Sequence, residues 1–172
     1  MNGMTSISLD LGCGTNPQNP FDADLVFGID SMRTASPDGR LVEVRKADLA
    51  VESIPFATAM FDFVTAYDFI EHIPRIVYLH SGPRCSFVEL MNEVFRVLRP
   101  GGTFFSLTPA YPSPKAFQDP THVNIITEST FPNYFCGDSP WARAYGFTGF
   151  FSLESQEWVE GSHLSCLMRK RT

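Results

Sequence analysis

The sequence predicts an α/β fold with a largely parallel sheet, and three observations support this prediction. Short apolar runs recur along the chain, and the early ones are nearly continuous in hydrophobic residues, as in strands buried on both faces. One amphipathic helical pattern lies between two of these runs. The chain has 172 residues, of which 44% are hydrophobic and 19% are charged. These values are typical of a globular domain, and we expect a single domain over residues 1–172.

Seven segments of the chain have the character of strands. Four of them precede the helical pattern and three follow it. In chain order they are residues 6–11, 24–30, 41–49, 61–69, 102–109, 144–153 and 163–170.

The helical pattern lies in the segment SFVELMNEVFRVLRPGG. Apolar residues recur at i, i+3 and i+4 from Phe87 to Leu98, and polar residues occupy the opposite face. Arg99 closes the last turn, and Pro100-Gly101-Gly102 is expected to stop the helix before the next strand. A strand, a helix, a turn and a strand in this order are typical of a βαβ unit with parallel strands.

The other connections have little room for helices. Residues 12–23 and 50–60 contain prolines, and residues 31–40 contain a Ser-Pro-Asp-Gly turn. A parallel crossover needs about a dozen residues, so these connections are just long enough. We therefore expect reduced helices on one face of the sheet. Because exposed apolar surface tends to mark interfaces, we also expect a homodimer or another partner there.

Charge and cysteine spacing exclude several classes of protein. The net charge is −6, whereas proteins that bind nucleic acid mostly present a basic stripe, so no nucleic acid partner is expected. The four cysteines form no C-x-x-C motif, which fits neither a zinc knuckle nor a disulfide framework. Neither a signal peptide nor a run of about 18 apolar residues is found. These features predict a cytoplasmic protein with no membrane partner.

A glycine pair follows the first predicted strand. Gly12 and Gly14 flank Cys13 just after Asp10, and Asp30 ends the second strand 20 residues beyond Asp10. In parallel sheets a ligand lies across the carboxyl ends of adjacent strands, where a carboxylate can accept hydrogen bonds from both hydroxyls of a ribose. Alone, Asp30 is equally well explained as the cap of the next turn. Together with the glycine loop, it favours a ribose-bearing ligand.

The prolines after the glycine pair distinguish two ribose-bearing ligands. A dinucleotide fingerprint has a third glycine and a helix whose N-terminus holds the pyrophosphate. Here Pro17 and Pro20 leave no room for a long helix. This disfavours an NAD(P)-dependent oxidoreductase and favours S-adenosyl-L-methionine, which has no pyrophosphate.

Five stretches of the chain resemble the class I S-adenosylmethionine-dependent methyltransferases. They are LDLGCGTNP, VFGID, KADLAVESIPF, FDFVTAYDFIEHIPR and EVFRVLRPGGTFFSLTP, in the order of the family. Asn16 stands where the family usually has a third glycine. The resemblance implies a Rossmann-like seven-stranded sheet, mostly parallel with the final strand antiparallel. Residues 6–109 would form the cofactor-binding core, and residues 110–172 the substrate loop and the last two strands.

The resemblance also implies which residues bind the cofactor. Asp10 would order the glycine loop or hold the methionine ammonium, and Asp48 would meet the adenine amino group. Asp48 is otherwise explained as an N-cap, and Tyr67 as sheet packing. The residues implied to bind S-adenosyl-L-methionine are Asp10, Gly12, Cys13, Gly14, Asp30, Asp48, Leu49 and Tyr67.

Three residues are candidates for the methyl-transfer site. In this reaction the cofactor carries the reactivity, and a general base is needed only if the acceptor must lose a proton. Asp68 and His72 follow the fourth strand, and His122 lies in a polar segment with Asp119 after the fifth. Alternatively, His72 packs structurally and His122 belongs to an Asx-type turn. The histidines lack ligand spacing such as H-x-x-x-H, so no metal is predicted.

Aromatic residues concentrate between residues 104 and 158, and Tyr111, Phe117 and Tyr134 are expected either in the core or in the wall of an apolar acceptor pocket. We expect an S-adenosylmethionine-dependent methyltransferase that acts on a small-molecule or metabolite-linked acceptor. A non-catalytic S-adenosylmethionine-binding subunit or regulatory module is the main alternative. An oxidoreductase and a nucleic acid methyltransferase are weaker ones.

Overall fold

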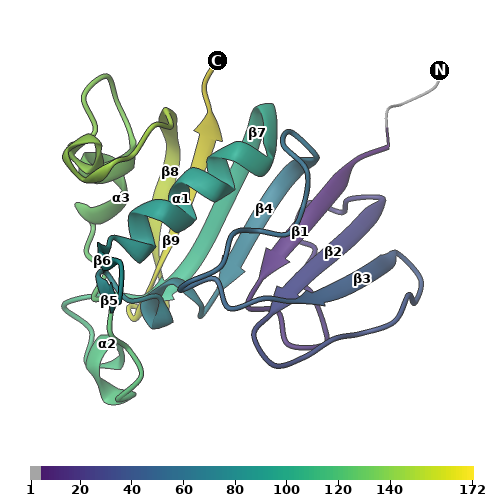
Figure 1. The fold of residues 1–172 in the computed structure, drawn as a ribbon, viewed down its shortest axis with the longest axis horizontal. Helices are drawn as coiled ribbons and strands as arrows, with labels where there is room; N and C mark the ends of the chain where they lie inside the picture. The colour runs from purple at the N-terminus through teal and green to yellow at the C-terminus, as the bar shows by residue number, and fades with distance from the viewer. Residues whose placement is uncertain (1–4) are drawn as a thin grey trace.

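The computed structural model describes residues 5–172, in which seven strands form one sheet of order β3-β2-β1-β4-β7-β9-β8 (Figure 1). Neighbours from β3 to β7 are parallel, and β9 runs antiparallel to both β7 and β8. The predicted fold class, a mostly parallel seven-stranded Rossmann-like sheet with an antiparallel last strand, is confirmed. The strands are β1 (Ile7–Leu11), β2 (Leu25–Asp30), β3 (Leu41–Lys46), β4 (Phe61–Tyr67), β7 (Leu98–Pro109), β8 (Phe151–Val159) and β9 (His163–Lys170).

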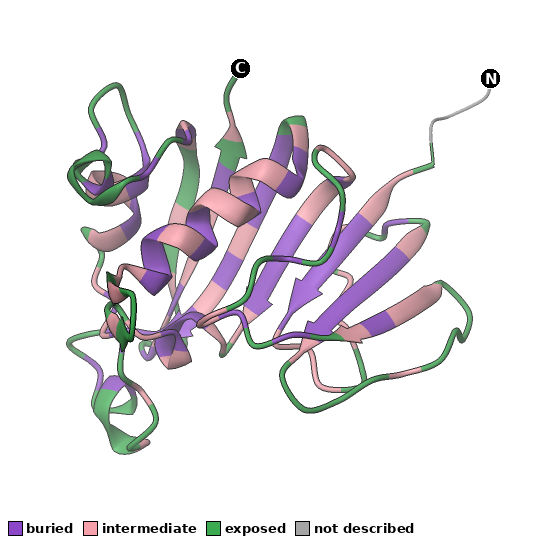
Figure 2. Cartoon of the chain, in the orientation of Figure 1, coloured by how far each residue is buried: buried purple, intermediate pink, exposed green. Residues whose placement is uncertain are grey.

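The central strands are buried on both faces, which explains their continuous apolar runs (Figure 2). Leu9 and Val64 face the helix-covered side of the sheet and have no exposed surface. Their neighbours Ser8 and Thr65 point to the other side and are equally buried. Because these polar side chains are buried, the side of the sheet opposite α1 must also be covered, and loops rather than helices cover it.

Helix α1 (Ser86–Val97) lies along one face of the sheet (Figure 1). Its apolar stripe, including Met91 and Val94, is fully buried. The helix ends at Val97, so Arg99, which was predicted to close its last turn, lies in β7 instead. The expectation that residues 100–102 separate the helix from the strand is also wrong. Strand β7 begins directly at Leu98 because Leu98 pairs with Phe61 of β4, so the Pro-Gly-Gly segment lies within the strand.

The connection between β3 and β4 also covers the α1 side of the sheet. Arg96 of α1 holds it by donating hydrogen bonds to the carbonyl oxygens of Ile54 and Phe56, both at 2.8 Å. Glu93 pairs with Arg96 at 2.7 Å and accepts from the Ile54 N–H at 2.9 Å. A loop fixed in this way replaces a helix over the first strands.

The opposite face carries no helix between β1 and β2 or between β2 and β3, as predicted for the thin connections. Phe21 of the first loop stacks on Phe63 of β4, with ring centroids 4.4 Å apart. Phe105, Leu107 and Leu167 on the same face are only half-buried. The homodimer expected through this face stays a prediction, which light scattering at micromolar concentration would test.

Smaller elements surround the end of the sheet near α1. They are the hairpin β5 (Val77–Leu79) and β6 (Gly82–Arg84), the 3₁₀ turns η1 (Ile70–His72) and η2 (Trp141–Tyr145), and the helices α2 (Lys115–Gln118) and α3 (Thr130–Phe135).

The predicted strand at 144–153 is wrong in its bounds. Gly146, with φ +91°, ends η2, and β8 begins only at Phe151. Among the described residues, no helix is long and apolar enough to cross a membrane.

Candidate cofactor and methyl-transfer site

The glycine loop closes over the carboxyl end of β1. The N–H groups of Gly12 and Cys13 both donate to the carbonyl oxygen of Ile29, at 2.8 and 3.1 Å. Gly12 has φ +68°, and a Cβ there would lie 2.3 Å from Cδ2 of Phe69. Gly14 has φ +59°, but a Cβ there would meet no atom within 4 Å. Gly12 is therefore required by protein packing, whereas the space beside Gly14 is open to a ligand.

Asp30 joins the glycine loop to the turn after β2. Its Oδ2 accepts from the Gly14 N–H at 3.0 Å, and its Oδ1 accepts from the N–H groups of Met32 and Arg33, both at 2.8 Å. The turn-capping alternative is thus part of its role. A carboxylate accepts about four hydrogen bonds, so one position remains for a ligand hydroxyl.

Asp10 is buried beneath the loop, with 2% of its surface exposed. It accepts hydrogen bonds from the Thr65 hydroxyl at 2.6 Å and from the Gln18 N–H at 2.8 Å. Burial raises the pKa of its carboxyl to about 6, although both hydrogen bonds oppose the shift. Of the two roles considered for Asp10, its contacts support the ordering of the loop.

Cys13 packs across β2, where a Cβ at Gly28 would lie 2.5 Å from its Sγ. Burial, followed by the charges of Asp10 and Asp30, raises the pKa of the Cys13 thiol to about 12. The side chain is therefore a neutral packing group. Gly28 was not singled out from the sequence, because only the folded loop shows that the position must lack a side chain.

A pocket of about 140 Å³ opens at the carboxyl ends of the first strands. Five predicted site residues from four segments line it: Gly12, Asp30, Asp48, Leu49 and His72. Prediction from the sequence missed the others, which are Ile29, Ser31, Ala47, Ala50, Phe69 and Ile73. All six are next to a predicted site residue in the sequence, so their position within the motifs was the signal that could have found them.

Asp48 and Leu49 differ in their surroundings. Asp48 is exposed, its Oδ1 accepts from the Ala50 N–H at 3.1 Å, and its own N–H donates to Glu52 Oε2 at 2.6 Å. This reciprocal arrangement supports the N-cap alternative and leaves Oδ2 available. Leu49 is 4% exposed and forms an apolar wall of the pocket.

Tyr67 and Asp68 are not among the residues that line the 140 Å³ pocket. Tyr67 is half-buried and packs against Phe105, with ring centroids 5.4 Å apart, as the packing alternative expects. Burial, and then the charge of Asp10, raises its pKa. Asp68 has φ +45° and an exposed side chain whose Oδ1 lies 3.1 Å from Nε2 of His163 on β9.

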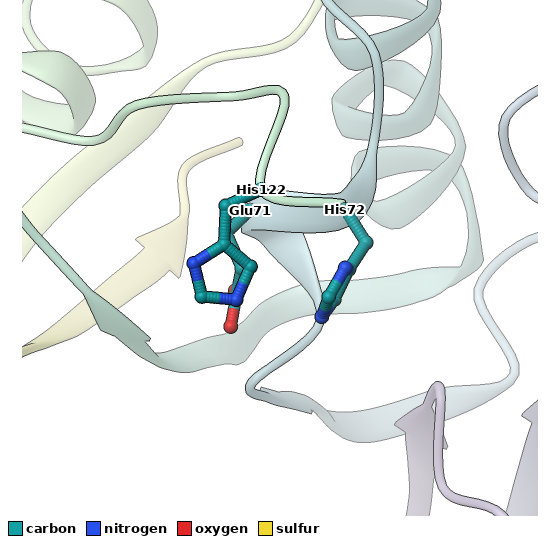
Figure 3. Close-up of side chains that lie close together, drawn as sticks. All are labelled: Glu71, His72 and His122. Carbon is teal, nitrogen blue, oxygen red and sulfur yellow. The ribbon is translucent and has the colours of Figure 1, made fainter. Parts of the chain in front are cut away.

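The fold brings His72 and His122 together from segments about 50 residues apart, with ring centroids at 4.9 Å (Figure 3). Nδ1 of His72 lies 3.0 Å from the Thr121 hydroxyl, which donates to Asp119 at 2.7 Å. Because Thr121 gives its only hydroxyl proton to Asp119, its oxygen accepts from Nδ1–H of His72. The free lone pair of His72 is then on Nε2.

Glu71, which was not predicted as a site residue, lies beside the two histidines (Figure 3). Only 1% of its surface is exposed. Its Oε2 accepts from the Thr108 hydroxyl at 2.7 Å, and its Oε1 has no hydrogen-bond partner among residues 5–172. Burial raises the pKa of this carboxyl above its usual range. Glu71 was missed because nothing in the sequence distinguishes a buried glutamate from the exposed glutamates that are common on protein surfaces.

A second, larger pocket of about 440 Å³ lies between residues 75–76, the N-terminal end of α1, α3 and η2. Tyr134, Trp141 and Tyr145 line it as an aromatic wall, and Arg75 adds a cationic group. Tyr134 lines this pocket and also packs against the core, so it fits both expected positions, while the binding of an acceptor there stays a prediction. Tyr111 and Phe117 are exposed elsewhere and pack only against each other among the aromatic residues described.

The sheet order, the glycine loop and a pocket lined by Asp30 and Asp48 at the carboxyl ends of the strands define a Rossmann-like protein of the methyltransferase class. A family model described as "Methyltransferase domain" matches residues 9–106. The chain belongs to this family, within the class I S-adenosylmethionine-dependent methyltransferase superfamily. No curated protein sequence matches it.

Solved structures share the fold at low sequence identity. A chain of the Haloferax volcanii complex with the Trm112 methyltransferase activator has a TM-score of 0.65 and 12% identity, covering 98% of this chain and 84% of that one. The S-adenosylmethionine-dependent methyltransferase from Mesorhizobium loti has values of 0.58 and 16%, covering 96% and 90%. The [4+2]-cyclase SpnF has values of 0.64 and 14%, covering 97% and 75%. Because one neighbour is a cyclase, the fold alone does not define the reaction.

Proposed function

We propose that this protein transfers a methyl group from S-adenosyl-L-methionine to a small-molecule or metabolite-linked acceptor. One observation carries the proposal: four residues from the three motifs implied to bind the glycine loop's ligand, its ribose and its adenine line a single pocket, namely Gly12, Asp30, Asp48 and Leu49. The remaining acceptor position of Asp30 fits a ribose hydroxyl, and the connection between β1 and β2 has no helix whose N-terminus could hold a pyrophosphate.

The protein's own residues would bind and orient both reactants. When bound, S-adenosyl-L-methionine supplies an activated methyl group. Asp30 would accept from a ribose hydroxyl, while Leu49 and Phe69 exclude water from the adenine position. His72 lines the same pocket and has its lone pair on Nε2, so it would accept the proton of a hydroxyl or amine acceptor.

Two other predicted residues have weaker support for a role in transfer. Asp68 is exposed and paired with His163, so we assign it the positioning of the segment after β4. His122 lies edge-on to His72 and would orient its ring. The pocket around Tyr134 and Arg75 would hold an apolar or aromatic part of the acceptor and an anionic substituent.

Calorimetry with S-adenosylhomocysteine tests the cofactor site. We expect one site per chain with micromolar affinity, and at least tenfold weaker binding by Asp30→Asn. Asp38→Asn is the matched control, because Asp38 is exposed in the turn before β3 and lies outside this pocket. A wild-type protein that binds no S-adenosylhomocysteine at millimolar concentration would overturn the proposal.

Turnover distinguishes the remaining alternatives. Transfer of labelled methyl groups to an acceptor library is expected from an enzyme. A protein that binds S-adenosylhomocysteine but methylates nothing in the library would instead be the non-catalytic subunit or regulatory module. Enhanced NADH fluorescence on titration would favour an oxidoreductase, and a salt-dependent gel shift would favour a nucleic acid substrate.

A further inference from the structure

Three potential metal ligands converge beside the cofactor pocket. Glu71 and His72 come from η1, and His122 comes from the segment after β7. One ligand atom from each lies within 4.8 Å of the other two (Figure 3). The spacing along the chain conceals this cluster, because its two halves are about 50 residues apart.

Two of these side chains hold buried polar atoms without partners. Oε1 of Glu71 and Nδ1 of His122 are both buried, and neither has a hydrogen-bond partner within residues 5–172. Burying such atoms unpaired is costly, and an unpaired carboxylate is the more costly of the two. A cation between Glu71 and the histidines would supply the partner that Oε1 of Glu71 lacks. Nδ1 of His122 points away from Glu71 and His72 (Figure 3), so Nε2 of His122 would be the ligand atom.

The neighbouring residues orient two of the three groups as metal ligands require. Metal-binding histidines usually donate their second ring N–H to an oxygen, which fixes the tautomer. His72 does this through Nδ1 to Thr121, which is held in turn by Asp119. Thr108 likewise donates to Oε2 of Glu71 and leaves Oε1 free.

We propose that Glu71, His72 and His122 bind a divalent transition metal such as Zn²⁺, Fe²⁺ or Co²⁺. Two histidines and one carboxylate suit these ions, and they leave coordination positions open. At bond lengths of about 2.1 Å the ligand atoms would lie about 3.0–3.5 Å apart, so the side chains must move inward by up to about 1.5 Å. Rotation of the two imidazole rings provides such a movement.

The position of this site suggests what the metal does. His72 also lines the cofactor pocket, so the open positions would face the methyl-transfer site. Resting on the proposed function, we infer an acceptor that binds through oxygen, such as a phenol, diol or carboxylate. The metal would lower the pKa of the bound hydroxyl, and His72 would then be a ligand rather than a base.

Titration of the full chain with Co²⁺ tests the site without cofactor or acceptor. We expect one Co²⁺ per chain, visible d–d absorption and a rise in Tm, with Zn²⁺ displacing the Co²⁺. His122→Gln and Glu71→Gln should each weaken binding at least tenfold. His80→Gln is the matched control, since His80 is exposed in the turn between β5 and β6.

The outcomes separate this proposal from the proposed function. Absence of binding at millimolar Co²⁺ and Zn²⁺, or binding that both variants retain, would overturn the metal site. If Glu71→Gln does not fold, His122→Gln alone decides, because His122 is only partly buried. Calorimetry with S-adenosylhomocysteine is read separately, so a failed cofactor site leaves the metal result interpretable.

Discussion

The buried carboxyl of Asp10 should make the stability of the protein depend on pH in an unusual direction. Its pKa is about 6 in the folded protein and 3.8 without burial. The folded state therefore binds more protons between these values, and the free energy of unfolding falls as pH rises through them. The difference corresponds to about 3 kcal/mol, most of which is lost between pH 4 and pH 7.

Asp10→Asn removes this dependence while it preserves the shape of the side chain. The Asn amide can face the Thr65 hydroxyl, and its oxygen can accept from Gln18. Urea unfolding at pH 4 to 7 should show the variant gaining about 2–3 kcal/mol on the wild type as pH rises. Asp24→Asn is the control of opposite sign, because hydrogen bonds from Ser6 lower the pKa of that exposed carboxyl. A difference between Asp10→Asn and wild type that stays constant with pH would refute the reasoning.

Three further substitutions test the packing that supports the site. Gly28→Ala should weaken S-adenosylhomocysteine binding at least tenfold and lower Tm, because its Cβ would lie 2.5 Å from Sγ of Cys13. Arg96→Gln should cost about 2 kcal/mol in urea unfolding, because two carbonyl oxygens of the β3–β4 connection lose their charged donor. Phe21→Ala should cost about 2 kcal/mol by the same measurement, through loss of the stack on Phe63.

Matched variants control for these effects. Cys13→Ala combined with Gly28→Ala should recover part of the loss, and no recovery would contradict the proposed clash. Arg169→Gln removes an exposed ion pair of 3.4 Å and should cost less than about 1 kcal/mol. Tyr111→Ala removes an exposed aromatic residue and should leave stability nearly unchanged. If the test and control substitutions lowered the free energy of unfolding equally, the buried contacts would not be the cause of the loss.

The fold was predictable where periodicity and burial agree. Helix α1 has one apolar stripe over its whole length, and β9 matches its predicted bounds at residues 163–170. Prediction failed where tertiary contacts decide the bounds. Pairing with Phe61 draws residues 98–101 into β7 despite their Pro-Gly signal, and the apolar residue Phe147 is buried without belonging to a strand.

The candidate site was predictable where one short motif supplies both the group and its position. Gly12 directly follows β1 and Asp30 is the last residue of β2, so the sheet itself places them at the pocket. Phe69 and Glu71 were missed because their roles depend on contacts with distant segments. The same limit applies to His122, which its motif marks as polar but which only the fold brings to His72.

The short segment after β4 connects the two halves of the site. Phe69 packs against Gly12 and so closes the cofactor pocket from the side of the glycine loop. Two residues later Glu71 is buried against β7, and His72 reaches both the pocket and His122. Because η1 is a single tight turn, a shift that brings Glu71 and His72 onto a metal would also move Phe69 toward or away from Gly12. Metal binding and cofactor binding should therefore be coupled, each changing the affinity for the other by the same factor.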